Sequence, residues 1–454
     1  MPKIPEKTTQ PVDTSALTSI GLSRRFPPAY WMSAGGEVAL YHGNCVKRLG
    51  DLPARSVHCV VTSPPYWGLR NYNDEEEQLG AEPLHDCGTH GKAQCNQCYV
   101  CSMVAVFRGV WRVLRDDGTL WLNLGDSYAG SSPGRNDVDR MYGEESQGRG
   151  LEARSGLASG NLVGIPWRVA LALQADGWVL RQDIIWAKPN PMPESVLNRC
   201  TKSHEYVFLF AKTQGYYYDS EAIKEESKTS WNSKSSLGSA TREKIKFMSP
   251  EDLDRQRTQF AFNTHHDDVE MTGRNKRSVW TVATTSYSGA HFAVFNSNLI
   301  TPMIEAGSSE HGCCTSCGKP WERIISKDVG APSDPDIDGR DRSLVSNRNG
   351  ITGSLDGERA RISTLGWRQA CACKDATVEP CVVLDPFIGS GTTAATAVTL
   401  GRHGVGIDLS DKYLDENAIP RIEAALRGEK VTRKVTTVIL PGKAPPTRVL
   451  GRKS

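Results

Sequence analysis

Long apolar runs and a strong net charge are both missing from this 454-residue sequence. No apolar stretch is long enough to cross a bilayer, and the first residues lack the pattern of a secretory signal, so no membrane partner is expected. The formal net charge is only +2, which provides no overall attraction to nucleic acid. A content of 38% hydrophobic and 23% charged residues is typical of a soluble globular chain, on which any DNA-binding surface must be local.

The sequence also lacks the two most familiar nucleotide-binding loops, although a glycine-rich turn lies between two apolar strands. This turn does not have the G-x-G-x-x-G spacing and lacks the lysine of a phosphate-binding loop. Its small residues let a ligand approach the backbone, and the following strand ends in Asp408, which suits a ribose diol. Since Asp385 would repel a pyrophosphate, the turn favours a nucleoside cofactor that carries positive charge. The candidate cofactor-binding residues here are Asp385, Pro386, Phe387, Gly389, Ser390, Gly391, Thr392, Thr393 and Asp408.

A second motif, Ser63-Pro64-Pro65-Tyr66, follows the apolar run 57–61, which is typical of a buried parallel strand. The prolines prevent both a continued strand and a helix start, so the chain must leave the carboxyl end of the strand as a stiff turn. Ligands bind at that end in open α/β sheets. The Ser63 hydroxyl and the Pro64 carbonyl can accept hydrogens from an amino group, and the Tyr66 ring can stack on a planar base. The plainer alternative is a proline turn with a structural tyrosine.

Thirteen cysteines in a chain without a secretory signal indicate reduced thiols or metal ligands instead of a disulfide framework. Eight of them form two groups with the spacing of structural zinc sites, namely Cys87, Cys95, Cys98 and Cys101, and then Cys314, Cys317, Cys371 and Cys373. Neither group suggests an open catalytic position. For the first group, the alternative is a set of free cysteines on a loop and a first helical turn.

The two motifs together resemble those of the DNA amino-methyltransferases, which methylate the exocyclic nitrogen of cytosine or adenine with S-adenosylmethionine. Their order, with the catalytic motif first, resembles the beta class, and the resemblance covers residues 36–220 and 278–425. It implies an α/β fold with a Rossmann-like methyltransferase sheet, mostly parallel with one antiparallel strand. Two consecutive apolar stretches, 178–186 and 203–212, would form the antiparallel pair of this sheet. Helices would cover both faces, and the zinc-binding loops would be insertions. A family member of this kind is expected in the cytoplasm of a bacterial or phage-infected cell.

The resemblance also implies roles for residues outside the two motifs. Asn44 stands where the family places an acidic residue near the adenine ring of the cofactor. The stretch 186–190 would lie beside the target base, which makes Lys188, Asn190 and His204 candidates. A helix over 103–114 is expected to end at Asp116-Asp117-Gly118, before a strand over 119–124. Asp126 and Tyr128 follow that strand and are expected at the same edge of the sheet as Ser63.

The expected organisation alternates family segments with polar insertions. The segments are 1–35 (flexible), 36–223 (catalytic half, with a cysteine-rich insert at 85–101), 224–277 (target recognition, or else a disordered linker), 278–310 with 376–427 (cofactor-binding half), 311–375 (zinc-ribbon-like insert) and 428–454 (basic tail). Residues 129–160 are rich in Gly, Ser and Arg and are expected to form a loop that closes over DNA.

The most specific function that the sequence predicts is methylation of N4 of a cytosine that has been flipped out of double-stranded DNA. Ser63 favours cytosine, because adenine-directed relatives usually carry Asp or Asn at this position. The alternatives are an N6-adenine DNA methyltransferase, a non-catalytic zinc-bearing DNA-binding protein, and a methyltransferase acting on RNA or a protein amide.

Overall fold

The computed structural model describes residues 21–68, 79–80, 82–84, 95, 97–129, 155–225, 274–284, 295–328, 361–374 and 377–429. Several expectations fall outside these residues: the first part of the N-terminal segment, Cys87, the loop at 130–154, most of the segment 224–277 and the basic tail at 430–454.

A single nine-stranded sheet forms the centre of the described structure, in the order β1-β2-β13-β12-β3-β4-β6-β5-β7. Its strands are β1 Trp31–Met32, β2 Val38–His42, β3 Val57–Thr62, β4 Leu114–Leu124, β5 Val179–Ala187, β6 His204–Ala211, β7 Val279–Thr281, β12 Val382–Asp385 and β13 His403–Asp408.

The sheet confirms the expected methyltransferase-like topology. Neighbouring strands from β2 to β4 all run parallel, whereas β6 runs antiparallel to both β4 and β5. The short strand β1 is also antiparallel, at the edge beside β2. Every residue of β3 is buried, as the uninterrupted apolar run in the sequence predicted.

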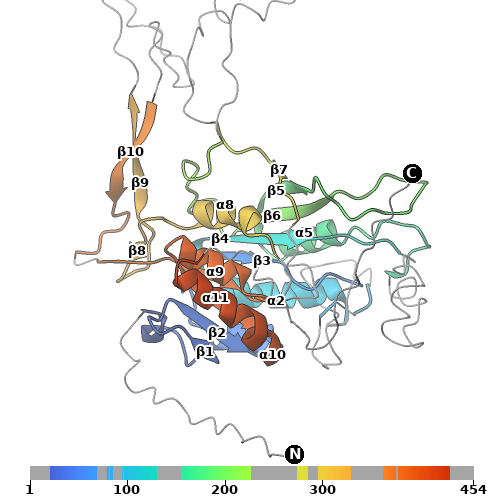
Figure 1. Ribbon diagram of the computed structural model, residues 1–454, viewed down its shortest axis with the longest axis horizontal. Coiled ribbons are helices and arrows are strands. Elements are labelled where there is room, and N and C mark those ends of the chain that lie inside the picture. Colours follow the sequence, from blue (N-terminus) through green and yellow to red (C-terminus); the bar gives the residue numbers. More distant parts are fainter. Residues whose placement is uncertain are drawn as a thin grey trace, which may run out of the picture.

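Helices cover both faces of this sheet (Figure 1). The helices are α1 Cys45–Asp51, α2 Tyr99–Val113, α5 Ile165–Ala175, α8 Ser297–Gly307, α9 Thr392–Thr399, α10 Asp411–Tyr413 and α11 Ile419–Leu426, with a π-helical turn at Leu414–Ala418. The apolar sides of α1, α2 and α5 share one core with the sheet. On the other face, α8 packs over β3 and β4, and α9 packs with α11 over β2. None of the described helices is both long and apolar enough to span a membrane.

The insert expected at 311–375 takes part in two small antiparallel sheets, one of which includes a strand just beyond the expected boundary. Strand β8 (Cys313–Cys314) pairs with β11 (Val378–Glu379), and β9 (Glu322–Asp328) pairs with β10 (Arg361–Arg368). Figure 1 shows the β9–β10 hairpin standing away from the central sheet.

One boundary differs from the sequence-based expectation. Residues 116–118, Asp-Asp-Gly, were expected to separate a helix from a strand, but α2 passes directly into β4 at Leu114. Leu114 already pairs with Val57, and a register shift between Val57 and Cys59 accommodates the extra residues. A pairing between distant strands therefore overrides the local turn preference.

Candidate functional site

The two motifs meet at the carboxyl edge of the sheet, although they are more than 300 residues apart in sequence. Strands β3 and β12 are parallel neighbours, with Val383 opposite Cys59. Ser63 and the glycine-rich turn therefore leave the sheet side by side. The hydroxyl of Thr62, the last residue of β3, donates to Asp385 Oδ1 at 2.7 Å and joins the two motifs directly.

Asp385 holds the glycine-rich turn in shape. It is only 2% exposed, and its oxygens accept hydrogen bonds from Thr62, from the Thr393 hydroxyl (2.7 Å) and from the backbone N–H of Phe387 (3.0 Å). Burial raises the pKa of this carboxyl to about 6, against the opposing effect of the hydroxyl donors. Asp385 thus contributes loop geometry and buried negative charge. Next to it, Pro386 is buried and Phe387 is half-buried against the core.

Asp408 fixes the next part of the turn. Its Oδ2 accepts the backbone N–H of Gly389 at 2.8 Å, and its Oδ1 accepts that of Ser410 at 3.0 Å. Gly389 has a φ of +49°, and an added Cβ there would meet no protein atom closer than 3.9 Å. The backbone at this position is therefore open to a ligand but conformationally restricted to glycine.

Gly391, with a φ of +79°, precedes α9. An arginine side chain that the sequence analysis did not single out supports the first turn of this helix. Arg421 of α11 is 6% exposed and donates from Nη1 to the hydroxyls of Ser390 (2.9 Å) and Thr392. Arg421 therefore fixes the side chains of these two predicted cofactor residues.

Asn44 lies at the same edge, since β2 is parallel to β13 and His42 is opposite Asp408. Its Oδ1 accepts the N–H groups of Val46 (2.9 Å) and Lys47 (3.3 Å) and so caps α1. The family resemblance implied that Asn44 contacts the cofactor, and the structure adds this capping role.

The Ser-Pro-Pro-Tyr turn is held by hydroxyl groups. Ser63 Oγ lies 3.2 Å from Tyr66 Oη, which in turn lies 2.7 Å from Glu205 Oε2 and 3.0 Å from Asn123 Oδ1. Burial, and secondarily the charge of Glu205, hold the pKa of Tyr66 well above its usual value, so the phenol stays protonated. Pro64 is buried, and the Pro65 carbonyl accepts a hydrogen bond from Tyr99 Oη at 2.8 Å.

Glu205 is a site residue that the sequence analysis missed. Its Oε1 pairs with the Lys188 ammonium, and its Oε2 also accepts the Asn123 amide at 3.2 Å. One signal could have found it: β6 runs antiparallel to the strands beside it, so the start of β6 lies at the edge where the parallel strands end. Lys188, a sequence candidate, thus reaches the site through Glu205.

The other candidates near this edge make structural contacts. Asn190 is bonded through its side chain to the backbone of Thr284, and the His204 ring packs against Tyr206. Asp126 accepts the N–H groups of Gly164 and Ile165 and caps α5. The ring of Tyr128 lies 4.0 Å below the Arg199 guanidinium.

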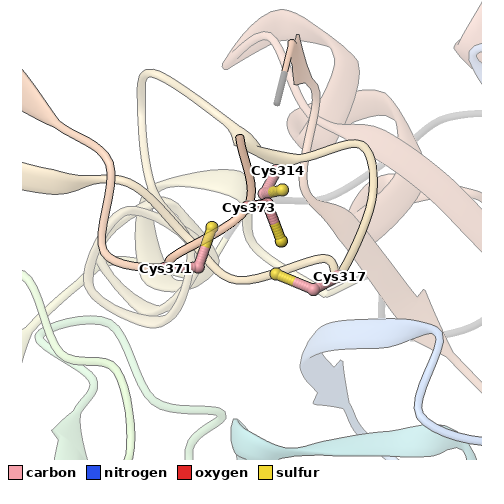
Figure 2. A group of neighbouring side chains, drawn as sticks. All are labelled: Cys314, Cys317, Cys371 and Cys373. Carbon is pink, nitrogen blue, oxygen red and sulfur yellow. The ribbon is translucent and has the colours of Figure 1, made fainter. Parts of the chain in front are cut away.

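The second cysteine group comes together as the spacing suggested (Figure 2). The sulfur atoms of Cys314, Cys317, Cys371 and Cys373 all lie within 4.8 Å of one another, and Figure 2 shows them converging from two chain segments. Tetrahedral coordination with Zn–S bonds of about 2.3 Å separates sulfurs by roughly 3.8 Å, so this arrangement fits a closed zinc site.

In the first group, the sulfurs of Cys95, Cys98 and Cys101 also lie within 4.8 Å of one another. Cys98 precedes α2 and Cys101 lies in its first turn, on either side of Tyr99. The fourth expected ligand, Cys87, lies outside the described residues.

A third cluster, which the sequence analysis did not anticipate, consists of His58, Cys313 and Cys381, all buried. His58 Nδ1 accepts the N–H of Val382 at 3.0 Å, and its Nε2 lies 2.8 Å from the carbonyl oxygen of Gly318. Both ring nitrogens already have backbone partners, so this cluster does not have the character of a metal site. It fastens the insert at 311–375 to β3 and β12.

Comparison with known proteins supplies the remaining finding. The family model for DNA methylases of the N6/N4 type matches residues 57–315 and 374–419. The Type II methyltransferase M.Cfr9I of Citrobacter freundii is 39% identical over 376 residues, which cover 83% of this chain and 85% of that protein. M.SmaI of Serratia marcescens is 32% identical over 397 residues, covering 86% and 90%. Among solved structures, the PvuII DNA methyltransferase (cytosine-N4-specific) aligns over 89% of this chain and 96% of its own, with 14% identity and a TM-score of 0.44.

Proposed function

This chain belongs to the family of N6/N4-type DNA methylases and is an S-adenosylmethionine-dependent DNA methyltransferase, and from that premise we propose that it methylates N4 of cytosine at specific sites in double-stranded DNA. Its relatives are Type II methyltransferases, which supports assignment to site-specific DNA modification. The observation that carries the choice of base is Ser63 at the end of β3, held by Tyr66.

Ser63 would assist the nucleophile of the reaction, which is the exocyclic amino nitrogen of the target base. The lone pair of an exocyclic amino group is delocalised into the base, so the nitrogen attacks poorly until its hydrogens are bound by well-placed acceptors. The Ser63 hydroxyl and the Pro64 carbonyl are those acceptors. A neutral serine suits N4 of cytosine, because it accepts one amino hydrogen without bringing the charge of an aspartate. The amino group is paired inside the duplex, so the base must be flipped out to reach this edge.

The cofactor would lie over the glycine-rich turn, where it supplies a methyl group on a positively charged sulfonium. Asp385 and Asp408 place negative charge at this turn, and Gly389 lets the cofactor approach the backbone. The residues that would hold it are those named from the sequence, Asn44, Asp385 to Phe387, Gly389 to Thr393 and Asp408. Neighbouring motifs then bring the methyl donor and the amino group to the same edge of the sheet.

Zinc would occupy both cysteine groups in a structural role. Four converging thiolates form a closed site with no position for substrate, and none of the cysteines needs to act as a nucleophile in a direct methyl transfer. Metal analysis of the purified protein should give about two zinc atoms per chain. A protein free of zinc, with all thiols titratable in the native state, would overturn this assignment.

The test of the proposed function is mass spectrometry of nucleosides from duplex DNA incubated with the enzyme and S-adenosylmethionine. N4-methylcytosine is expected. N6-methyladenine in its place would overturn the choice of base but keep the catalytic site. Absence of any methylated nucleoside, together with failure to bind the cofactor in a calorimetric titration, would favour the non-catalytic DNA-binding alternative.

A further inference from the structure

Four polar side chains form a continuous hydrogen-bonded chain that leads away from the catalytic serine. It begins at Ser63 Oγ, passes through Tyr66 Oη at 3.2 Å, and reaches Glu205 Oε2 at 2.7 Å. The other oxygen of Glu205 pairs with Lys188. The side chains of this final pair are only 14% and 19% exposed, so water screens their charges weakly.

The chemistry of the partners sets the direction of the hydrogen bonds. Glu205, paired with an ammonium, is a carboxylate and can only accept. The single hydroxyl hydrogen of Tyr66 has two acceptors within reach, and the shorter contact is the one to the charged oxygen of Glu205, which forms the stronger bond. Tyr66 Oη is then left as an acceptor, and Ser63 donates to it.

We propose that Glu205 is a positioning residue for methyl transfer, which acts through Tyr66 to turn the lone pairs of the Ser63 hydroxyl toward the amino group of the target base. This inference rests on the proposed function and deepens it. A serine hydroxyl beside a base can either accept from the amino group or donate to the neighbouring ring nitrogen. With its hydrogen committed to Tyr66, Ser63 is held in the accepting state before the substrate arrives, so no reorientation is needed during the reaction.

The same chain offers a path for the proton that the reaction releases. The amino nitrogen forms a bond to the methyl carbon while the carbon–sulfur bond breaks and its electron pair returns to sulfur. The nitrogen, now carrying an extra proton, passes it to Ser63 Oγ. Ser63 passes its own proton to Tyr66 Oη, and Tyr66 passes its own to Glu205 Oε2. Each hydroxyl is regenerated, and Glu205 ends protonated beside Lys188.

The variant that tests this inference is Glu205→Gln, which keeps the size of the side chain but presents an amide that can donate to Tyr66. We expect kcat to fall about 10- to 100-fold, the range for loss of a charge-assisted hydrogen bond, while the KM values for DNA and cofactor change less than about twofold. Tyr66→Phe, which severs the chain but keeps the Glu205–Lys188 pair, should give a similar loss. The matched control is Glu322→Gln, which breaks the exposed pair with Arg368 on the β9–β10 hairpin and should leave kcat unchanged.

The decisive comparison is made in a Ser63→Ala background. If Glu205 acts through Ser63, adding Glu205→Gln to Ser63→Ala should cause no further loss, because groups that act as one unit are not additive. If the two fold-losses in kcat multiply in the double variant, the proposal is overturned. It is also overturned if the Glu205→Gln enzyme has the same kcat as the parent. If Glu205→Gln does not fold, the same comparison is made with Tyr66→Phe.

The rates are measured on whichever nucleoside the parent enzyme methylates. A parent that makes N6-methyladenine therefore defeats the choice of cytosine but still tests the role of Glu205. Unchanged kcat in Glu205→Gln, with N4-methylcytosine as product, defeats the role of Glu205 alone.

Discussion

The carboxyl and amino edges of the central sheet use similar polar groups for different purposes. At the carboxyl edge, Asp385, Asp408 and Glu205 each accept hydrogen bonds from loop residues that belong to the proposed site. At the amino edge, His58 binds the backbone on both sides of its ring, and Arg115 donates to the Cys317 carbonyl oxygen at 2.8 Å. The first set shapes the loops of the proposed site, and the second fastens an insert to the core.

The two cysteine groups sharpen this contrast, because each belongs to a different edge. Cys314 and its partners are attached beside Gly318 and β8, where β3 and β12 begin. Cys98 and Cys101 flank Tyr99, which contacts Pro65 in the Ser-Pro-Pro-Tyr turn. The zinc proposed for both groups should therefore affect stability at one edge and catalysis at the other.

The largest expected effect is at the amino edge. Cys317→Ser should remove one zinc and lower the free energy of unfolding by several kcal/mol. This loss is a fraction of the free energy with which a complete structural site binds zinc. Metal analysis and thermal unfolding measure the two changes. The cofactor affinity of the folded protein should stay unchanged, and a selective loss of that affinity without a loss of stability would break the comparison.

Two glycines at the carboxyl edge should separate cofactor binding from folding. Gly389→Val introduces a β-branched residue at a positive φ in open space, so it should abolish measurable cofactor binding in calorimetry while costing about 1–2 kcal/mol of stability. Gly391→Ala is the control, because its Cβ would lie 2.8 Å from Ala418 Cα and should destabilise the fold itself. Normal cofactor binding by a folded Gly389→Val protein would remove Gly389 from the site.

Asp385 should make the stability of the parent depend on pH. Its pKa in the folded protein is raised to about 6, above the value in the unfolded chain, so its favourable contribution is complete at low pH and is lost as the pH rises through about 6. Relative to Asp385→Asn, the parent should therefore lose up to about 3 kcal/mol between pH 4 and pH 7. Denaturant titrations at several pH values measure the difference, and a constant difference would contradict the buried charge.

The smallest expected effect comes from single hydrogen bonds at the two edges. Tyr99→Phe frees the Pro65 carbonyl and should lower kcat a few-fold, in line with a loss of about 1 kcal/mol. Ser309→Ala removes a bond of 2.8 Å to the Trp321 carbonyl oxygen in the insert region and should lower stability by a similar amount without changing kcat. Equal effects of both variants on kcat would erase the distinction between the edges.

The parts of the fold and site that the sequence predicted are those encoded by continuous segments. The apolar runs that lead to Thr62 and Asp385 each predict a strand. The proline turn and the glycine-rich turn that follow them predict the loops at the ends of these strands. Parallel pairing then places the two loops together, as Thr62 and Asp385 show. The antiparallel strand pair β5 and β6 was predicted from two consecutive apolar stretches.

Contacts that depend on packing between distant segments were not predictable in the same way. Glu205 is the one acidic residue of β6, Arg421 lies in the short helix α11, and the partners of both come from elsewhere in the chain. His58 lies inside an apolar strand and gives no sign in the sequence that it receives the N–H of Val382. Such side chains acquire their roles only when the order of the strands is known.

The most direct test of the account is hydrogen exchange of the backbone amides with and without S-adenosylmethionine. The cofactor should slow exchange in peptides covering 386–393 and 408–413, because the N–H groups of this turn lie at its proposed binding site. Peptides covering 313–321, at the amino edge, should exchange at the same rate in both samples. Protection of 313–321 by the cofactor, with no change at 386–393, would contradict the assignment of methyl transfer to the carboxyl edge.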